Sequence, residues 1–231
     1  MRKYVLFLIF SLVINILKAQ TVDEKLMKKM CECITFSIDN KSLNDQKFDT
    51  CWSTDTSLIK EIEDFFLKND TLNTDEEAGY RFGKIYFEKN QTRFISECDG
   101  FYQYIDSSRY EFLNEVKPTI QLKLIDSLTQ QINLHKDESE LYHLRGLAYF
   151  SLLKFNEAKS DFNKALSLPH ASIQCLYFRA WIAEIEGNYV DAISDYKLAK
   201  KNSGIVYIDM LIAITERKKK EFTTVKNGPP I

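Results

Sequence analysis

The sequence predicts an all-α protein: a short helical solenoid preceded by a small, disulfide-linked helical region. Apolar residues recur at the spacing of three and four that is typical of amphipathic helices. Seven glycines and four prolines among 231 residues are few for an antiparallel β fold, which uses these residues in its turns. A third observation, an internal repeat of 34 residues in the second half of the chain, is typical of stacked helical hairpins.

Residues 1–19 have the three-part pattern of a secretory signal peptide. Arg2 and Lys3 form a basic start, residues 4–17 are almost entirely apolar, and Ala19 provides a small residue before the expected cleavage point. The apolar stretch is shorter than the roughly 20 residues of a comfortable membrane span, so an uncleaved anchor is the less favoured alternative. We expect an exported protein, periplasmic or extracellular in a bacterium, with no membrane span after cleavage.

Export makes the cysteines candidates for disulfide bonds. Cys31 and Cys33 lie in a predicted helix over residues 23–39, where residues two apart point about 200° apart, so they do not easily bond to each other. Each is therefore expected to bond to Cys51 or Cys98. The favoured pairing is Cys31 with Cys51 and Cys33 with Cys98, because Cys33 shares a helical face with apolar residues.

The alternative for Cys31 and Cys33 is a metal or redox site. Zinc sites usually use Cys-x-x-Cys pairs, and the chain has no second pair. Structural disulfides are therefore the preferred interpretation. Cys175 has no evident partner and is expected to pack as a small apolar residue.

The cysteine-containing region, residues 20–104, is predicted to hold three helices. The first covers residues 23–39, the second residues 57–68, and the third runs from residue 74 past Cys98 to residue 104. The region is too small and polar for a large core. Two disulfides would offset this by about 2–4 kcal/mol each.

The strongest signal in the chain is the 34-residue repeat. A shift by this period aligns small residues with small residues, aromatic with aromatic residues, and one Arg and one Asp with themselves. The aligned pairs are Arg145/Arg179, Gly146/Ala180, Phe155/Tyr189, Ala158/Ala192, Ser160/Ser194, Asp161/Asp195, Phe162/Tyr196 and Ala165/Ala199. Small residues let the two helices of a unit cross closely, and units bury their apolar faces by stacking.

Residues 139–204 resemble the tetratricopeptide repeat family. In the first unit the matching residues are Gly146, Tyr149, Ala158, Phe162, Ala165 and Pro169. The second unit is a weaker match that keeps Gly187 at the turn between its helices. The resemblance implies a helical solenoid that binds a protein or peptide and needs no cofactor or metal.

Two repeats are too few for a stable solenoid, so faded units are expected on both sides. Upstream, residues 107–116 are predicted to be the first helix of a faded repeat, and its second helix carries Leu124, Leu128, Ile132 and Leu134. Downstream, residues 205–218 are predicted to form a capping helix and residues 221–231 a loose tail. The repeat region then covers residues 105–220.

In this family the first helices of successive repeats line a concave groove that binds peptides or protein segments. Carried over by spacing, six side chains are expected to face the groove: His143, Leu147, Phe150, Tyr177, Trp181 and Glu184. The paired Lys, Arg and Asn residues with which well-known members hold a carboxylate terminus are absent, so that ligand class is not expected. The alternative is that the aromatic members pack on a neighbouring helix of the chain itself.

The recurring Arg and Asp residues are predicted to form ion pairs within each repeat. Arg145 lies sixteen residues before Asp161, as Arg179 does before Asp195, and antiparallel helices joined by a short turn bring these positions level. We expect each pair to form a charge-assisted hydrogen bond between the two helices. The alternative is that both arginines lie on the surface and cover apolar neighbours with their stems.

These patterns favour an exported adaptor or scaffold that binds a protein or peptide through a tetratricopeptide groove. A net charge of −2 provides no basic excess for nucleic acid, and no catalytic constellation is visible. Two alternatives remain open. One is a thiol or metal protein that uses Cys31 and Cys33, and the other is a structural component of an envelope assembly without a peptide groove.

Overall fold

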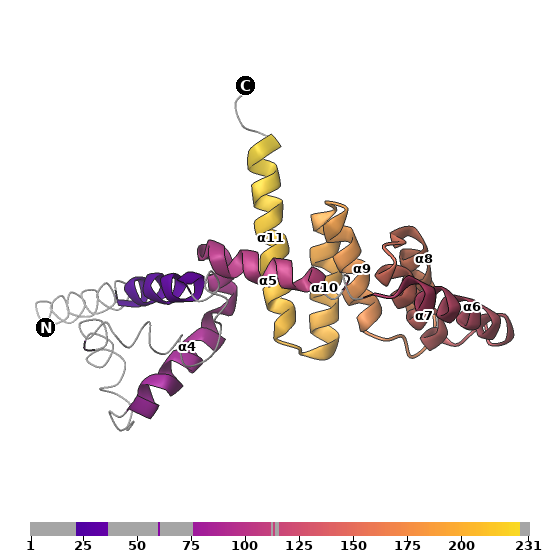
Figure 1. Cartoon of the computed structure of the whole chain (residues 1–231), viewed down its shortest axis with the longest axis horizontal. Helices are drawn as coiled ribbons and strands as arrows, with labels where there is room; N and C mark the ends of the chain where they lie inside the picture. Colours follow the sequence, from indigo (N-terminus) through magenta and orange to yellow (C-terminus); the bar gives the residue numbers. More distant parts are fainter. Residues whose placement is uncertain (1–21, 37–59, 61–75, 112, 114–115, 227–231) are drawn as a thin grey trace, which may run out of the picture. The chain divides into compact units, whose positions relative to one another are not determined.

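The computed structural model describes residues 22–36, 60, 76–111, 113 and 116–226 (Figure 1). Every regular element within these ranges is helical, which confirms the predicted all-α class. Within the same ranges, no helix is both long and apolar enough to cross a membrane. The signal peptide expected at residues 1–19 and the helix expected at residues 57–68, apart from residue 60, lie outside the described residues.

Contacts divide the chain into a first unit, residues 1–104, and a second unit, residues 105–231. The predicted third helix is assigned as two helices that meet at Cys98: α4 (Glu76–Glu97) belongs to the first unit, and α5 (Asp99–Glu111) begins in the first unit and ends in the second. The helix over residues 22–36 buries its apolar side chains at helical spacing. The largest buried side chains of the first unit are Leu26, Met30, Phe94 and Ile95.

A polar cluster accompanies this small core. The hydroxyl of Tyr86 on α4 donates to the carboxylate of Asp23 over 2.6 Å, and Arg93 forms an ion pair with the same carboxylate. Burial and the hydrogen bond to Asp23 raise the pKa of Tyr86. At the start of α5, a Cβ atom on Gly100 would collide with Thr35, so the absence of a side chain permits this close approach.

The disulfides differ from the favoured pairing. Cys98 bonds to Cys31 and not to Cys33, so the pairing of Cys33 with Cys98 is wrong. The shared helical face was a poor guide, because the face that meets the junction of α4 and α5 carries Cys31 and, one turn later, Thr35, which lies against Gly100. Cys33 is fully buried and also disulfide-bonded, and Cys51 lies outside the described residues.

We predict that Cys33 bonds to Cys51, because Cys175 is a free, buried cysteine and Cys31 is joined to Cys98. Peptide mapping of the non-reduced protein should recover one linked peptide for each of the two disulfides. Recovery of Cys51 as a free thiol in folded, oxidised protein would contradict this pairing.

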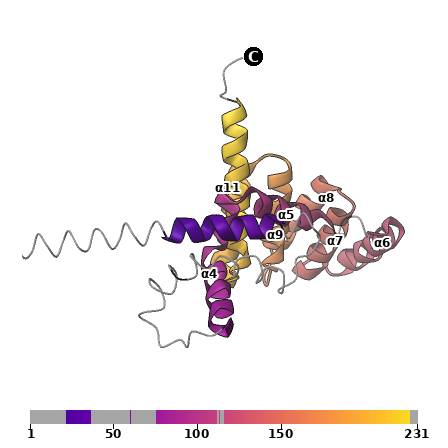
Figure 2. The same ribbon diagram turned by 60° about the vertical axis from the view of Figure 1, so that its left-hand side comes forward.

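The second unit is a row of helical hairpins that follow one another in chain order (Figures 1 and 2). Its helices after α5 are α6 (Pro118–Leu134), α7 (Ser139–Ser151), α8 (Phe155–Leu166), α9 (Gln174–Ile185), α10 (Tyr189–Ser203) and α11 (Tyr207–Lys226). The helix pairs α7–α8 and α9–α10 form the two clear repeats. The turns between them contain Leu153 and Gly187, which lie 34 residues apart and both have positive φ angles, 58° and 78°.

The small residues of the repeat lie where its helices cross. A Cβ atom on Gly146 of α7 would lie 2.6 Å from the ring of Phe162 on α8, and this ring is fully buried. Ala158 and Ala165 of the same hairpin are fully buried as well. The repeat therefore depends on a close approach of the two backbones at Gly146.

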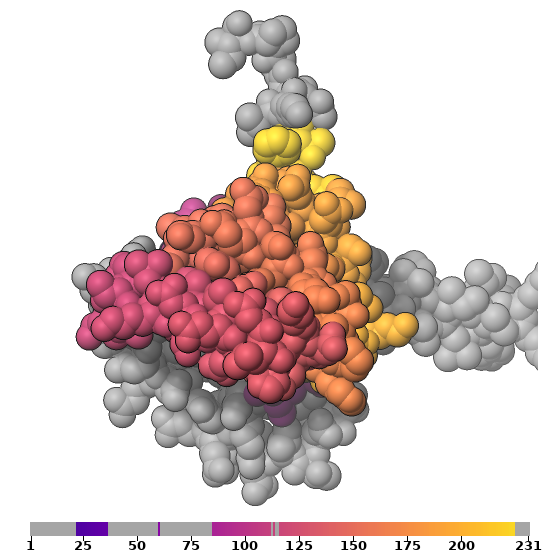
Figure 3. Space-filling model, turned by 90° about the vertical axis from the view of Figure 1, so that its right-hand side faces the viewer, coloured from indigo at the N-terminus to yellow at the C-terminus, as the bar shows by residue number. Residues whose placement is uncertain are grey.

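The flanking elements require three corrections. Residues 107–111 are the end of α5, so no separate helix begins at residue 107, and residues 112, 114 and 115 of the predicted helix lie outside the described residues. In α6, Ile125 is buried in place of Leu124, which is exposed, as is Leu134. Figure 3 views the molecule from the side on which α6 lies in Figure 1. The predicted cap is longer than expected, since α11 continues through residues 221–226 of the tail that we expected to be loose.

We predict that Gly146→Ala lowers the free energy of unfolding by about 1 kcal/mol. The overpacking against Phe162, about 1–3 kcal/mol, should outweigh the better helix propensity of alanine, about 1 kcal/mol. Chemical denaturation would measure the difference. Leu144→Ala, at an exposed position of the same helix, is the control and should change stability by less than about 0.5 kcal/mol. A more stable Gly146→Ala variant would contradict the prediction.

Candidate functional site

The residues predicted to line a groove come together on α7 and α9, but they are not open to solvent. His143, Phe150, Trp181 and Glu184 are buried, and Leu147 and Tyr177 are half-buried. The rings of Phe150 and Trp181 contact each other with centroids 5.1 Å apart. The expectation that Phe150 and Trp181 are exposed anchors is therefore wrong.

Part of this surface is covered by the chain's own helix α5. The guanidinium carbon of Arg109 lies 4.9 Å from the centroid of the Trp181 ring, and the ring of Tyr110 meets the same indole edge-on at 5.6 Å. Only 2% of the Arg109 side chain is exposed. The last turn of α5 thus occupies the place in front of α9 where the resemblance predicts an external ligand.

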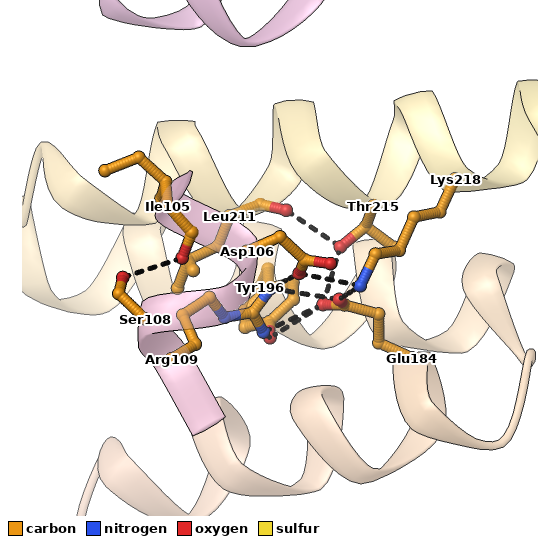
Figure 4. Close-up of polar contacts among 9 residues, drawn as sticks. All are labelled: Ile105, Asp106, Ser108, Arg109, Glu184, Tyr196, Leu211, Thr215 and Lys218. Atoms are coloured by element: carbon orange, nitrogen blue, oxygen red, sulfur yellow. Dashed lines mark hydrogen bonds and ion pairs between the residues drawn. The ribbon is translucent and has the colours of Figure 1, made fainter. Parts of the chain in front are cut away.

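The carboxylate of Glu184, which is completely buried, is the centre of the contacts (Figure 4). Arg109 donates a hydrogen bond to each of its oxygens, from Nη1 to Oε1 over 2.9 Å and from Nη2 to Oε2 over 3.0 Å. The hydroxyl of Tyr196 on α10 donates to Oε2 over 3.3 Å, and the hydroxyl of Thr215 on α11 lies 3.0 Å from the same oxygen. One carboxylate therefore binds side chains from three other helices.

A second cation and a second carboxylate complete the cluster. Lys218 Nζ on α11 lies 2.9 Å from Glu184 Oε1 and 2.7 Å from Asp106 Oδ1 on α5. Arg109 Nη1 is also 3.3 Å from Asp106 Oδ1. We call these four residues the ionic cluster. Its two positive and two negative side chains balance, which is the arrangement that buried charges require.

The pKa shifts follow from this balance. Burial disfavours the charge of Glu184, but the nearby Arg109 and Lys218 outweigh burial and lower its pKa. Burial opposes the charge of Arg109 as well, but Tyr196 and Glu184 raise its pKa overall. Burial raises the pKa of Tyr177, beside Trp181, to about 12. Arg109 and Lys218 are consequently cationic and Glu184 is anionic at neutral pH, while Tyr177 and Tyr196 are neutral.

The predicted ion pairs within the repeats are present in the structure. Arg145 donates to both oxygens of Asp161 over 2.7 Å, and Arg179 donates to both oxygens of Asp195 over 2.6 and 2.7 Å. The Asp161 side chain is only 6% exposed. These partly buried, two-pronged contacts join the two helices of each repeat.

Each of these arginines also reaches back to the preceding helix. Arg145 Nη1 donates to Thr129 on α6, and Arg179 Nη1 donates to Asn163 on α8. Thr129 and Asn163 are themselves 34 residues apart. This spacing supports the prediction that α6 is the second helix of a faded repeat.

An open pocket of about 480 Å³ lies beside the ionic cluster in the second unit. Its apolar wall consists of Tyr110, Ile185, Tyr189 and Phe222, and its charged rim includes Lys218 and Glu221. The rings of Tyr189 and Phe222 meet edge-on at 5.9 Å, and Phe222 is 51% exposed. Tyr110 and Glu184 belong both to this pocket and to the surface that α5 covers, so the pocket adjoins the covered surface.

The remaining candidates for chemistry are isolated. His143 Nδ1 lies 3.3 Å from Glu140 Oε2, while its buried Nε2 has no hydrogen-bond partner among the described residues. Cys175 is fully buried, and burial raises the pKa of its thiol to about 11, which makes it unreactive. Within the described ranges, no three His, Cys, Asp or Glu side chains are grouped so that they could hold a metal ion.

Comparison with protein families matches residues 139–169, the α7–α8 hairpin, to the tetratricopeptide repeat. The resemblance predicted from the sequence is thereby confirmed for this repeat. Comparison with curated proteins and with solved structures finds no match. The tetratricopeptide repeat is in general a protein–protein interaction element, so the second unit contains a module of this kind.

We predict that Glu184→Gln lowers the free energy of unfolding by about 3 kcal/mol at pH 7, because Arg109 is then buried without its main counter-charge. The folded-state pKa of Glu184 is lowered. Its stabilising effect is therefore present above the unfolded carboxyl pKa of about 4.3, and it is lost as the pH falls through the folded value. Urea denaturation between pH 7 and pH 3 should show the two proteins converging in acid.

Glu186→Gln is the matched control for this experiment. Glu186 pairs with Lys159 at 2.6 Å, but both side chains are partly exposed. The control should cost less than about 1 kcal/mol. Stability curves of wild type and Glu184→Gln that stay parallel down to pH 3 would show that folding does not lower the pKa of Glu184.

Proposed function

We propose that this protein is an exported, non-catalytic adaptor whose second unit binds a protein partner at the open pocket between α9 and α11. The observation that carries the proposal is the pocket itself. It lies on a tetratricopeptide-type solenoid and offers an exposed aromatic side chain, Phe222, next to a cluster of balanced charges. Aromatic side chains in such positions often dominate binding energy.

The pocket has the composition of a small protein-binding site. Tyr110, Ile185, Tyr189 and Phe222 can hold an apolar side chain of a partner, while Lys218 and Glu221 can bond to its polar groups. The filled surface over Trp181 does not offer this, because α5 covers it. A partner segment therefore has to begin its contact at the pocket.

Two observations support export. Residues 1–19 have the pattern of a signal peptide. The Cys31–Cys98 disulfide is of the kind that persists in the periplasm or outside the cell. The same disulfide argues against the thiol or metal alternative, which requires Cys31 and Cys33 as accessible reduced thiols, whereas both are disulfide-bonded.

A binding experiment with the full mature chain tests this function. The tagged protein should retain a partner from the exported fraction of its native cell, and Phe222→Ala should weaken the affinity of the purified partner about tenfold or more. Leu134→Ala is the matched control, because it removes an exposed apolar side chain from α6, outside the pocket. Unchanged affinity of the Phe222→Ala variant would overturn the pocket as the binding site.

A structural component of an envelope assembly is the second candidate. The burial of Phe150 and Trp181 favours it, because a filled groove can serve solely to stabilise the solenoid. This candidate replaces the adaptor if the tagged protein retains no partner and neither Phe222→Ala nor Leu134→Ala changes what is captured.

A further inference from the structure

The last turn of α5 contacts the second repeat in the way that a bound peptide would. Arg109 and Tyr110 are adjacent residues, and both contact Trp181. Asp106, one turn earlier, bonds to Lys218. Three side chains on one face of a helix therefore engage three different features of the solenoid: a buried carboxylate, an indole ring and an amine.

The contacts that hold this segment are mostly ionic. Arg109 has its bidentate contact with Glu184, and Asp106 has its contact with Lys218. Buried ion pairs contribute little net stability, because the loss of hydration offsets most of the attraction. The apolar contact of this segment includes Tyr110, which is only partly buried and packs against Trp181. Such a segment can be released at lower cost than a helix that interdigitates with a core.

The surface that this segment covers, formed by Glu184 and Trp181, keeps most of its other contacts when the segment is absent. Glu184 keeps Lys218 at 2.9 Å and the hydroxyls of Tyr196 and Thr215, so its charge remains compensated. Trp181 keeps its ring contacts with Phe150, Tyr177 and Phe178. What release of α5 exposes is therefore an ordered site: a carboxylate beside an indole ring, next to the open pocket.

We propose that residues 106–110 are an internal ligand of the second repeat, and that the protein partner displaces them with a helical segment of the same chemistry. This segment carries an arginine for Glu184 and Trp181, followed by an aromatic residue, with a carboxylate one turn earlier for Lys218. The proposal rests on the proposed function and adds to it the chemistry of the partner and the regulation of the site. The partner first meets the open pocket beside Phe222 and then replaces Arg109.

An internal ligand lowers the apparent affinity of the partner. The apparent dissociation constant equals the intrinsic constant divided by the fraction of molecules in which the site is free. A change that weakens the internal ligand without altering the site raises this fraction and tightens external binding. An ordinary structural contact at the same place would not have this effect, because its loss would not create a binding site.

The test measures binding of a fluorescently labelled peptide with the sequence of α5, residues 99–111, to the full mature chain. Wild type should bind it at least tenfold more weakly than Arg109→Ala, in which the internal ligand lacks its main contact. The same peptide with alanine in place of its arginine should not bind either protein. Lys123→Ala, which removes an exposed cation from α6, is the matched control and should bind the peptide as wild type does.

Two further variants keep the proposal falsifiable. Tyr110→Ala weakens the internal ligand without touching the charges and should also increase peptide binding, so it replaces Arg109→Ala if that variant does not fold by circular dichroism. Adding Glu184→Gln to the weakened variant should abolish the gain, because the peptide arginine loses its counter-charge. Equal peptide binding by wild type and both folded variants, or none by any of them, would overturn the internal ligand.

The outcome separates this inference from the proposed function. If Phe222→Ala weakens the captured partner but the peptide binds no variant, the pocket function stands and the internal ligand is wrong. If the peptide binds Arg109→Ala but Phe222→Ala leaves the partner's affinity unchanged, the pocket function is wrong. Displacement of the captured partner by the peptide from the Arg109→Ala variant supports both.

Discussion

The buried carboxylate of Glu184 is the constraint around which the second unit is arranged. A carboxylate with no exposed surface has to be paired, and here it takes side chains from α5, α10 and α11. The equivalent position of the preceding repeat, 34 residues earlier, holds Phe150, which packs in the apolar core. The second repeat thus has a carboxylate, Glu184, where the first repeat has an aromatic ring, Phe150. This difference explains why α5 and α11 both contact the second repeat at this position.

The position of α5 has a consequence at the other end of the solenoid. The helix that precedes α6 in the chain contacts α9, α10 and α11 through its side chains, so it does not serve as the first helix of an α6 repeat. Leu124 of α6 consequently stays exposed, whereas Thr129 still receives the arginine contact that marks a second helix. The hydrogen bond from Arg145 to Thr129 that is typical of a repeat is therefore kept. The helix that would have been the first helix of this repeat, α5, packs against α9, α10 and α11 instead.

The parts of the fold that the sequence predicts are those that recur. The 34-residue period correctly indicates the helices of both repeats and the pairing of Arg145 and Arg179 with their aspartates, because these features occur in both repeats of the sequence. The place of Arg109 could not be predicted, since this residue occurs once and its partner lies 75 residues away in the chain. The left-handed conformation of Leu153 could not be predicted either, because a leucine does not indicate a positive φ angle, whereas the glycine at the equivalent position of the second repeat, Gly187, does.

The same reasoning explains why the predicted groove residues were identified correctly as a set but not as an exposed surface. Spacing determines which face of a helix a residue occupies, so residues on α7 and α9 do lie together. Whether that face is open depends on what else the chain places against it, and the family pattern does not contain that information. If the partner binds here as proposed, it has to displace a segment that is held mainly through ion pairs. The affinity for the partner is then set by competition between two ligands of like chemistry, one of which is always present at the high effective concentration of a tethered segment.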